Sequence, residues 1–157
     1  MKLYQLGEYN SKSDLPEQAR TIRDYITVNH TYELIKQFMD QFDELEEESI
    51  IILKRAIFAG YWTSYYGFAW TSEQEISFWE LIAAKNQKSG VAALTLAETY
   101  RGNGTKTLKE VVHLYFKAIE INSEHFYSFS TEDLDSLKVD PELLPKIIEM
   151  ERKYKLN

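Results

Sequence analysis

Apolar residues recur every three or four positions along most of the chain, which is the spacing of one face of an α-helix. One such stripe consists of Leu15, Ala19, Ile22 and Ile26, and a second of Leu34, Ile35, Phe38, Phe42 and Leu45. Only six Gly and three Pro interrupt the 157 residues, so the helices should be joined by short turns. No segment stands out as a strand, and the pattern therefore predicts an all-α fold.

Helix-start signals divide the chain into seven or so helices. Capping-box spacings occur at Ser72 with Glu75 and at Thr107 with Glu110. Helices are expected to begin near residues 14, 31, 47, 72, 90 and 107, followed by a short one at 131–137 and a last one that begins at Asp140 or, because of Pro145, one turn later. Short turns make consecutive helices antiparallel neighbours. We therefore expect a single domain over 1–157, with residues 1–13 interpreted as an irregular N-terminal arm.

Two of the expected hairpins resemble each other. Their segments are residues 56–60 with 78–84 for the first and residues 93–97 with 114–119 for the second. Gly60 and Ala97 are 37 positions apart, and Trp79 and Tyr115 are 36 apart, a period found in helix–turn–helix solenoids. A small residue on the first helix lets the second approach closely, and a large aromatic residue on the second fills the space between hairpins.

The repeated segments also match a family pattern. Its clearest stretches are Trp79-x-x-x-Ala83-Ala84, then Ala93-x-x-x-Ala97-x-x-Tyr100-x-Gly102-x-Gly104, and then Tyr115-Phe116-Lys117-Ala118. Over residues 55–121 the chain resembles the Sel-one-like and tetratricopeptide repeat family, although the turn after Tyr100 is one residue short. The resemblance implies an α/α repeat array with a concave scaffold surface for a protein or peptide and no chemistry of its own. The flanking helices would then cap both ends.

Composition narrows the classes of function. The formal net charge is −7 and the isoelectric point is about 5.0, so the surface should repel nucleic acid and attract basic proteins. The absence of Cys excludes disulfides, thiolate nucleophiles and Cys-ligated metals. The longest aliphatic run, Ile50–Leu53, is too short to span a membrane, and the first residues contain no signal-like apolar run. We expect a cytoplasmic protein that does not bind nucleic acid or membranes directly.

Six acidic residues occur within nine positions between the second and third expected helices. They are Asp40, Asp43, Glu44, Glu46, Glu47 and Glu48. One interpretation is a solvated turn whose last carboxylates lie at the positive end of the next helix. The other is a docking patch for a basic partner, whose approach the charges would steer.

Eight aromatic residues occur within the nineteen positions 61–79. Because these residues cannot all point in one direction on a helix, part of the cluster should belong to the core. The alternative for the rest is a groove in which Trp62, Tyr66 or Trp70 anchors a partner.

Candidate chemistry is sparse. Glu110-x-x-His113 has the spacing of one quarter of a di-iron carboxylate site, but no second Glu-x-x-His accompanies it. His30 is expected beside a helix cap and His125 in a loop. The segment 101–107 contains Gly, Lys and Thr without the spacing of a phosphate-binding loop, and Gly-x-Ser-x-Gly is absent. We therefore expect no catalytic, metal-binding or cofactor-binding residues.

Three functions are compatible with these features. The leading hypothesis is a non-catalytic helical-repeat protein that binds another protein, most specifically an acidic immunity protein or antitoxin that blocks a basic toxin. The second is an adaptor whose aromatic groove binds a peptide tail. The third is an enzyme or small-ligand protein with a pocket between helices, for which Glu110, His113 and Tyr115 are the candidates.

Overall fold

Helices make up the regular secondary structure of the part of the chain that the computed structural model describes, residues 15–62 and 70–155. They are α1 (Glu17–Val28), α2 (Tyr32–Met39), α3 (Glu47–Trp62), α4 (Ser72–Lys85), α5 (Gly90–Gly102), α6 (Leu108–Ile121), the 3₁₀ helix η3 (Ser123–Ser128), α7 (Thr131–Lys138), α8 (Leu144–Met150) and the π-helical turn η4 (Glu151–Lys155). This confirms the all-α class. The expected arm at 1–13 lies outside the described residues.

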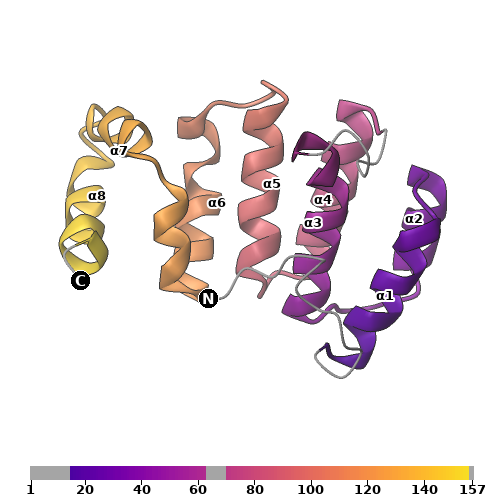
Figure 1. Cartoon of the computed structure of the whole chain (residues 1–157). Coiled ribbons are helices and arrows are strands. Elements are labelled where there is room, and N and C mark those ends of the chain that lie inside the picture. The colour runs from indigo at the N-terminus through magenta and orange to yellow at the C-terminus, as the bar shows by residue number, and fades with distance from the viewer. Residues whose placement is uncertain (1–14, 63–69, 156–157) are drawn as a thin grey trace.

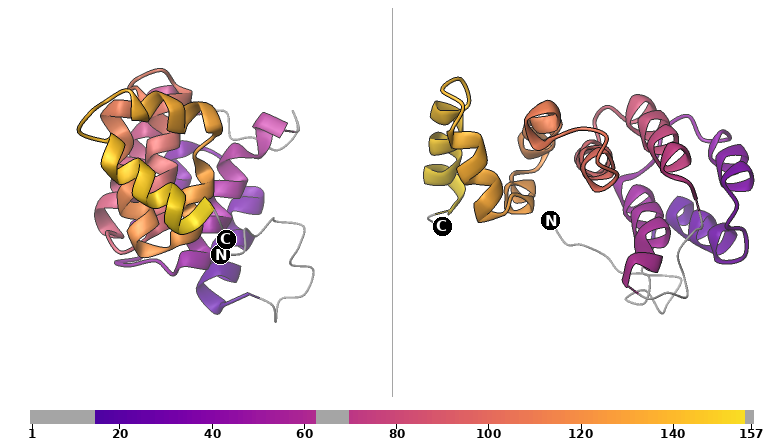
Figure 2. Two further views of the ribbon diagram at one scale, coloured as in Figure 1. Left: turned by 90° about the vertical axis from the view of Figure 1, so that its left-hand side faces the viewer. Right: turned by 90° about the horizontal axis from the view of Figure 1, so that it is seen from above.

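The helices form a row that leads from α1 and α2 at one end to α7 and α8 at the other, and α3 and α4 overlap in this view (Figure 1). α5 packs against both of its sequence neighbours, α4 and α6. α1 also packs on α3, and α3 on α5, so helices two apart along the chain are in contact. Seen from above, the row extends across the whole molecule and several of its helices are viewed nearly end-on (Figure 2).

Hydroxyl side chains fix where most helices begin. Thr31, Thr71, Ser89, Thr107 and Ser130 each accept a hydrogen bond from the backbone N–H three residues later. The predicted capping box at Thr107 and Glu110 is confirmed. The box predicted at Ser72 is wrong by one residue, because Thr71 and Gln74 form it.

Two helices are shorter than their sequence patterns suggest. α2 ends at Met39, so Phe42 and Leu45 lie in the following loop. Leu34, expected in the buried stripe, is 40% exposed, whereas Met39 is 2% exposed and takes the inner position. The last helix begins at Leu144 with Pro145 in its first turn, which is the later of the two expected starts.

A 3₁₀ helix that the sequence did not predict follows α6. The side chain of Asn122 caps η3 by accepting a hydrogen bond from the backbone N–H of Glu124 at 3.0 Å. Phe126, within η3, and Phe129, just after it, are buried. The ring of Phe129 stacks on Tyr115 of α6 with centroids 4.7 Å apart. Six residues are too few to show a helical period, so this segment carries no clear pattern.

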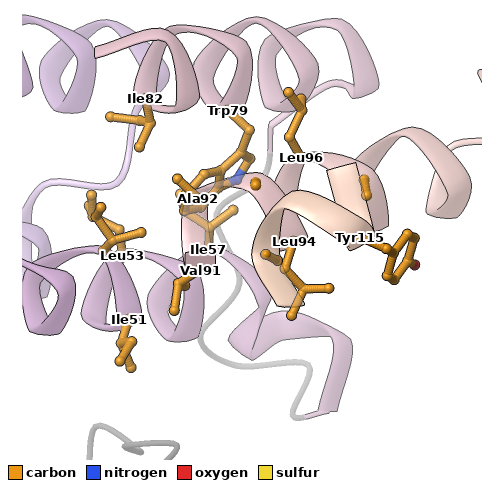
Figure 3. Close-up of a cluster of buried hydrophobic side chains, with 14 of the residues drawn as sticks. Ile51, Leu53, Ile57, Trp79, Ile82, Val91, Ala92, Leu94, Leu96 and Tyr115 are labelled. Atoms are coloured by element: carbon orange, nitrogen blue, oxygen red, sulfur yellow. The ribbon is translucent and has the colours of Figure 1, made fainter. Parts of the chain in front are cut away.

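The core is densest around α5, whose residues from Gly90 to Ala97 are all buried. Figure 3 shows Trp79 of α4 and Tyr115 of α6 on either side of this helix, and these side chains are 0% and 2% exposed. Alanines on α5 let the neighbouring backbones approach, and the two aromatic rings fill the remaining space. One contiguous set of buried apolar side chains continues from Leu15 to Met150.

Candidate interaction surfaces

The acidic loop, defined here as residues 40–48, is attached to α1 through one side chain. The amide oxygen of Gln18 accepts hydrogen bonds from the backbone N–H of Glu46 and the hydroxyl of Ser49, both at 2.7 Å. The amide nitrogen of Gln18 donates to the carbonyl oxygen of Glu44 at 3.2 Å. This one amide thus fixes the backbone at two positions of the loop.

A second attachment comes from the turn between α4 and α5. The backbone N–H of Leu45 donates to the side-chain oxygen of Asn86 at 2.7 Å, and Asn86 is 5% exposed. The amide nitrogen of Asn86 in turn donates to the carbonyl oxygen of Ile82 at 2.9 Å. The hydroxyl of Ser89 donates to the carboxylate of Glu47. Held from two sides, the loop presents its acidic side chains from a fixed backbone.

The carboxylates of the acidic loop point mostly to solvent. Exposed side chains are those of Asp40, Asp43, Glu44 and Glu46, while Glu47 and Glu48 are half-buried. Within the described ranges none of the six forms an ion pair, in contrast to Glu98 of α5 and Asp133 of α7. Their negative potential is therefore not neutralised by a bonded cation of the described chain.

A small pocket adjoins the acidic loop. It is lined by Glu44, Leu45, Glu47, Asn86, Lys88 and Ser89 and has a volume of about 90 Å³. Ligand pockets usually measure several hundred Å³, so this space suits a few water molecules or the tip of one inserted side chain. The pocket is therefore a small feature of the loop surface.

Of the three aromatic residues expected to anchor a partner, only Trp70 lies where its side chain is described. The side chain of Trp62 and the whole of Tyr66 fall outside the described residues. The indole N–H of Trp70 donates to the carbonyl oxygen of His30 at 2.8 Å, and its half-buried ring packs edge-on against Tyr32 and Phe78. These contacts join α4 to the α1–α2 turn, and a partner contact at Trp70 stays a prediction.

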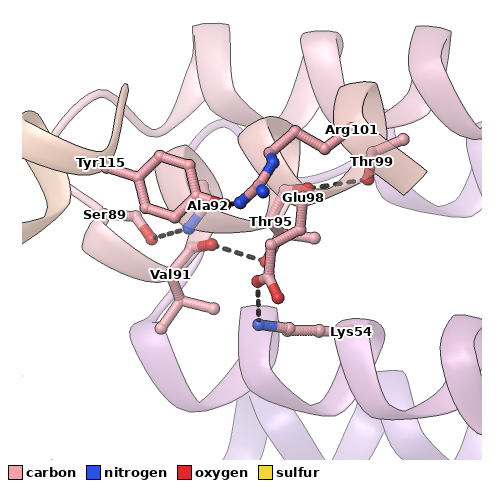
Figure 4. Close-up of polar contacts among 9 residues, drawn as sticks. All are labelled: Lys54, Ser89, Val91, Ala92, Thr95, Glu98, Thr99, Arg101 and Tyr115. Atoms are coloured by element: carbon pink, nitrogen blue, oxygen red, sulfur yellow. Dashed lines mark hydrogen bonds and ion pairs between the residues drawn. The ribbon is translucent and has the colours of Figure 1, made fainter. Parts of the chain in front are cut away.

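Paired charges connect α3 to α5 and α5 to α7. Figure 4 draws Lys54 of α3 with Glu98 and Arg101 of α5. Lys54 and Glu98 form an ion pair at 2.8 Å. Arg101 donates to both carboxylate oxygens of Asp133, at 2.8 and 3.3 Å, and to the hydroxyl of Tyr115 at 2.9 Å. No sequence pattern predicted these pairs, because their members come from separate helices.

Three groups at or near these contacts have shifted pKa values. Burial alone would raise the pKa of Asp133, but the hydrogen bonds from Arg101 and Ser130 hold it below its ordinary value. Burial raises the pKa of Tyr115 against the opposing effect of Arg101. On α5, burial and then the 2.5 Å hydrogen bond to Glu80 raise the pKa of Tyr100 to about 12. All three groups act as fixed structural contacts near neutral pH.

The candidate enzyme residues do not converge on a site. The carboxylate of Glu110 accepts a hydrogen bond from the backbone N–H of Thr107 at 2.9 Å as part of a cap, and His113 is exposed. His30 lies beside a helix cap, as predicted, whereas His125 is buried and not in an open loop. Over the described ranges, no group of three or more His, Asp and Glu residues is placed to hold a metal ion.

No protein-family model, curated protein or solved structure matches this chain. The described helices include none with the length and apolar character that a membrane crossing requires.

Proposed function

We propose that this chain is a non-catalytic helical-repeat protein that binds a basic protein partner through the acidic loop. In its most specific form it is an immunity protein or antitoxin that covers a basic toxin. The observation that carries the proposal is the acidic loop itself, in which exposed carboxylates stand on a backbone held by Gln18 and Asn86. A preorganised charged surface loses little conformational entropy on binding.

The distribution of charge supports the same surface. Residues 15–62 carry nine acidic and five basic side chains, residues 70–122 carry six of each, and residues 123–155 carry eight acidic and five basic. The excess of negative charge in the first half comes from the acidic loop. A concentrated patch of one sign increases the rate at which a partner of the opposite sign associates, and a nuclease-type toxin must be basic to hold phosphates.

The repeat architecture belongs to the proposal as well. Support comes from the two hairpins that the sequence relates, because their equivalent positions Trp79 and Tyr115 are both buried and lie on either side of α5. The terminal helices have mainly polar outer faces, which a capped array requires. Exposed side chains on them are Glu33, Leu34, Lys36 and Gln37 of α2 and Pro145, Lys146, Ile148 and Glu149 of α8.

The test is affinity capture from the source cells with two charge-matched variants. The loop variant carries Asp43→Asn, Glu44→Gln and Glu46→Gln. The control carries Asp135→Asn, Glu142→Gln and Glu149→Gln, three exposed acidic residues at the far end of the row. Both lose the same charge, so a difference between them reports position and not net charge.

We expect the wild type and the control variant to capture the same basic protein, and the loop variant to lose it. Raising the salt concentration should release the partner, since exposed charges are screened over about 8–10 Å at moderate ionic strength. A partner that the loop variant still captures would overturn the assignment of the acidic loop. Salt-resistant capture would instead favour the peptide-adaptor hypothesis.

A further inference from the structure

His125 lies in η3, at the junction between α5, α6 and the C-terminal helices. Its side chain is only 3% exposed, and its Nε2 atom is buried and forms no hydrogen bond within the described structure. Its backbone N–H donates to the carbonyl oxygen of Asn122 at 3.0 Å, which holds it in the first turn of η3. A buried imidazole nitrogen without a partner is uncommon, since burying a polar group normally requires a hydrogen bond.

The imidazole ring rests on the first residue of α5. A Cβ atom placed on Gly90 would lie 2.8 Å from Nε2 of His125 and 3.0 Å from its Cδ2. It would also lie 3.3 Å from the carbonyl oxygen of Ala118 of α6. Glycine at this position therefore lets η3 and α6 approach α5 closely.

Two charged side chains face His125 from the packed helices. Lys54 comes from α3 and Glu98 from α5, and they form an ion pair with each other at 2.8 Å. Burial first, and then the positive charge of Lys54, lower the pKa of His125, while Glu98 acts in the opposite direction. The ring is consequently neutral at pH 7 and packs as an aromatic side chain.

A proton on Nε2 would be incompatible with this packing. It would place an N–H and a positive charge against the Gly90 backbone, where Nε2 has no hydrogen-bond partner in the described structure. The ring would have to leave its place, and η3 would have to move with it. Phe126 and Phe129, which follow His125 and are 2% and 7% exposed, would lose their burial in the same step.

We propose that His125 is a proton-sensitive contact through which mild acidification releases η3, α7 and α8 from α5 and α6. The inference rests on the packing and burial of His125 and is independent of the proposed partner. This contact gives the C-terminal end of the row a conformational response to pH. The other two His residues, His30 and His113, are exposed and form no such buried contact.

The direction of the effect follows from linkage. A histidine whose pKa is lower in the folded state than its ordinary 6.5 binds more protons when the contact opens. The closed contact is therefore fully stable above about pH 6.5 and loses stability as the pH falls toward the lowered pKa of the folded state.

Hydrogen–deuterium exchange at about pH 7.5 and about pH 5.5, corrected for intrinsic rates, tests the proposal. We expect the amides of α7 and α8 to lose protection at the lower pH while those of α3 keep theirs. His125→Phe, which keeps an aromatic ring without a titrating nitrogen, should abolish this response. His113→Gln, at an exposed histidine of α6, should retain it.

Two outcomes would overturn the proposal. One is equal protection of α7 and α8 at both pH values in the wild type. The other is a wild-type-like pH response in His125→Phe. If the larger phenyl ring prevents folding against Gly90, His125→Leu serves as the non-titrating variant. NMR titration of the His125 ring in the wild type provides a direct check, because a pKa at or above its ordinary value would also contradict the proposal.

Discussion

The guanidinium group of Arg101 lies 2.8 Å from the carboxylate of Asp133 and so connects the end of α5 to the first turn of α7. The same group donates to the hydroxyl of Tyr115 on α6 at 2.9 Å. One side chain thus joins three helices. The contact is important for the attachment of the C-terminal helices, because the connecting residues between α6 and α7 contribute only the short η3.

Replacing Arg101 tests this connection. Arg101→Met keeps the aliphatic part of the side chain and removes all three hydrogen bonds. Because Arg101 is about one-third exposed, we expect a loss of about 1–2 kcal/mol in the free energy of unfolding, measured by urea denaturation. Arg152→Met, at an exposed position of η4, should change it by less than about 0.5 kcal/mol. Equal effects of the two variants would contradict a role for the Arg101 contacts.

Asp133 should give the protein a defined response to acid. Its pKa lies below the ordinary value of 3.8 in the folded protein, so its contribution to stability is present above that value and disappears as the pH falls below it. Asp133→Asn should therefore have a flatter dependence of the melting temperature on pH in this range than the wild type. Asp135→Asn, on the exposed side of α7, should follow the wild type.

The start of α4 offers a test between neighbouring residues. The hydroxyl of Thr71 accepts a hydrogen bond from the backbone N–H of Gln74 at 3.1 Å, whereas Ser72 is the first helical residue and caps nothing. We expect Thr71→Ala to lower the free energy of unfolding by about 1 kcal/mol and Ser72→Ala to leave it nearly unchanged. A larger loss of stability in Ser72→Ala than in Thr71→Ala would instead assign the cap to Ser72, as the sequence predicted.

Asn86 should control the rigidity of the acidic loop. Asn86→Ala leaves the buried N–H of Leu45 without an acceptor, which costs about 1–3 kcal/mol. Exchange of the Leu45 and Glu46 amides should accelerate in this variant. Gln87→Ala, at the exposed neighbouring position, is the matched control. It should leave both the free energy of unfolding and the exchange rates of the two amides unchanged. An unaltered exchange rate in Asn86→Ala would show that Gln18 holds the loop alone.

Local patterns were sufficient to predict most of the helices. The stripe of Leu15, Ala19, Ile22 and Ile26 is buried in full, and the cap at Thr107 lies where its spacing placed it. Errors occurred where two local signals competed. Thr71 and Ser72 both have side chains that cap helices well. The apolar residues after Met39 continue the helical spacing, although the helix itself ends at Met39. The difference in intrinsic propensity between two such alternatives is smaller than the effect of tertiary packing. Propensity therefore does not decide between them.

The sequence by itself determined the helical class, the position of most helix starts and the concentration of negative charge at residues 40–48, because each of these depends on neighbours along the chain. Only the tertiary structure decided which side chains hold that charge in place and which histidine is buried. Gln18 and Asn86 reach the acidic loop from about 26 and 41 positions away, and His125 meets Gly90 across 35. Such contacts have no period and no motif. They arise when helices that are separate in sequence pack at a distance that their small residues allow.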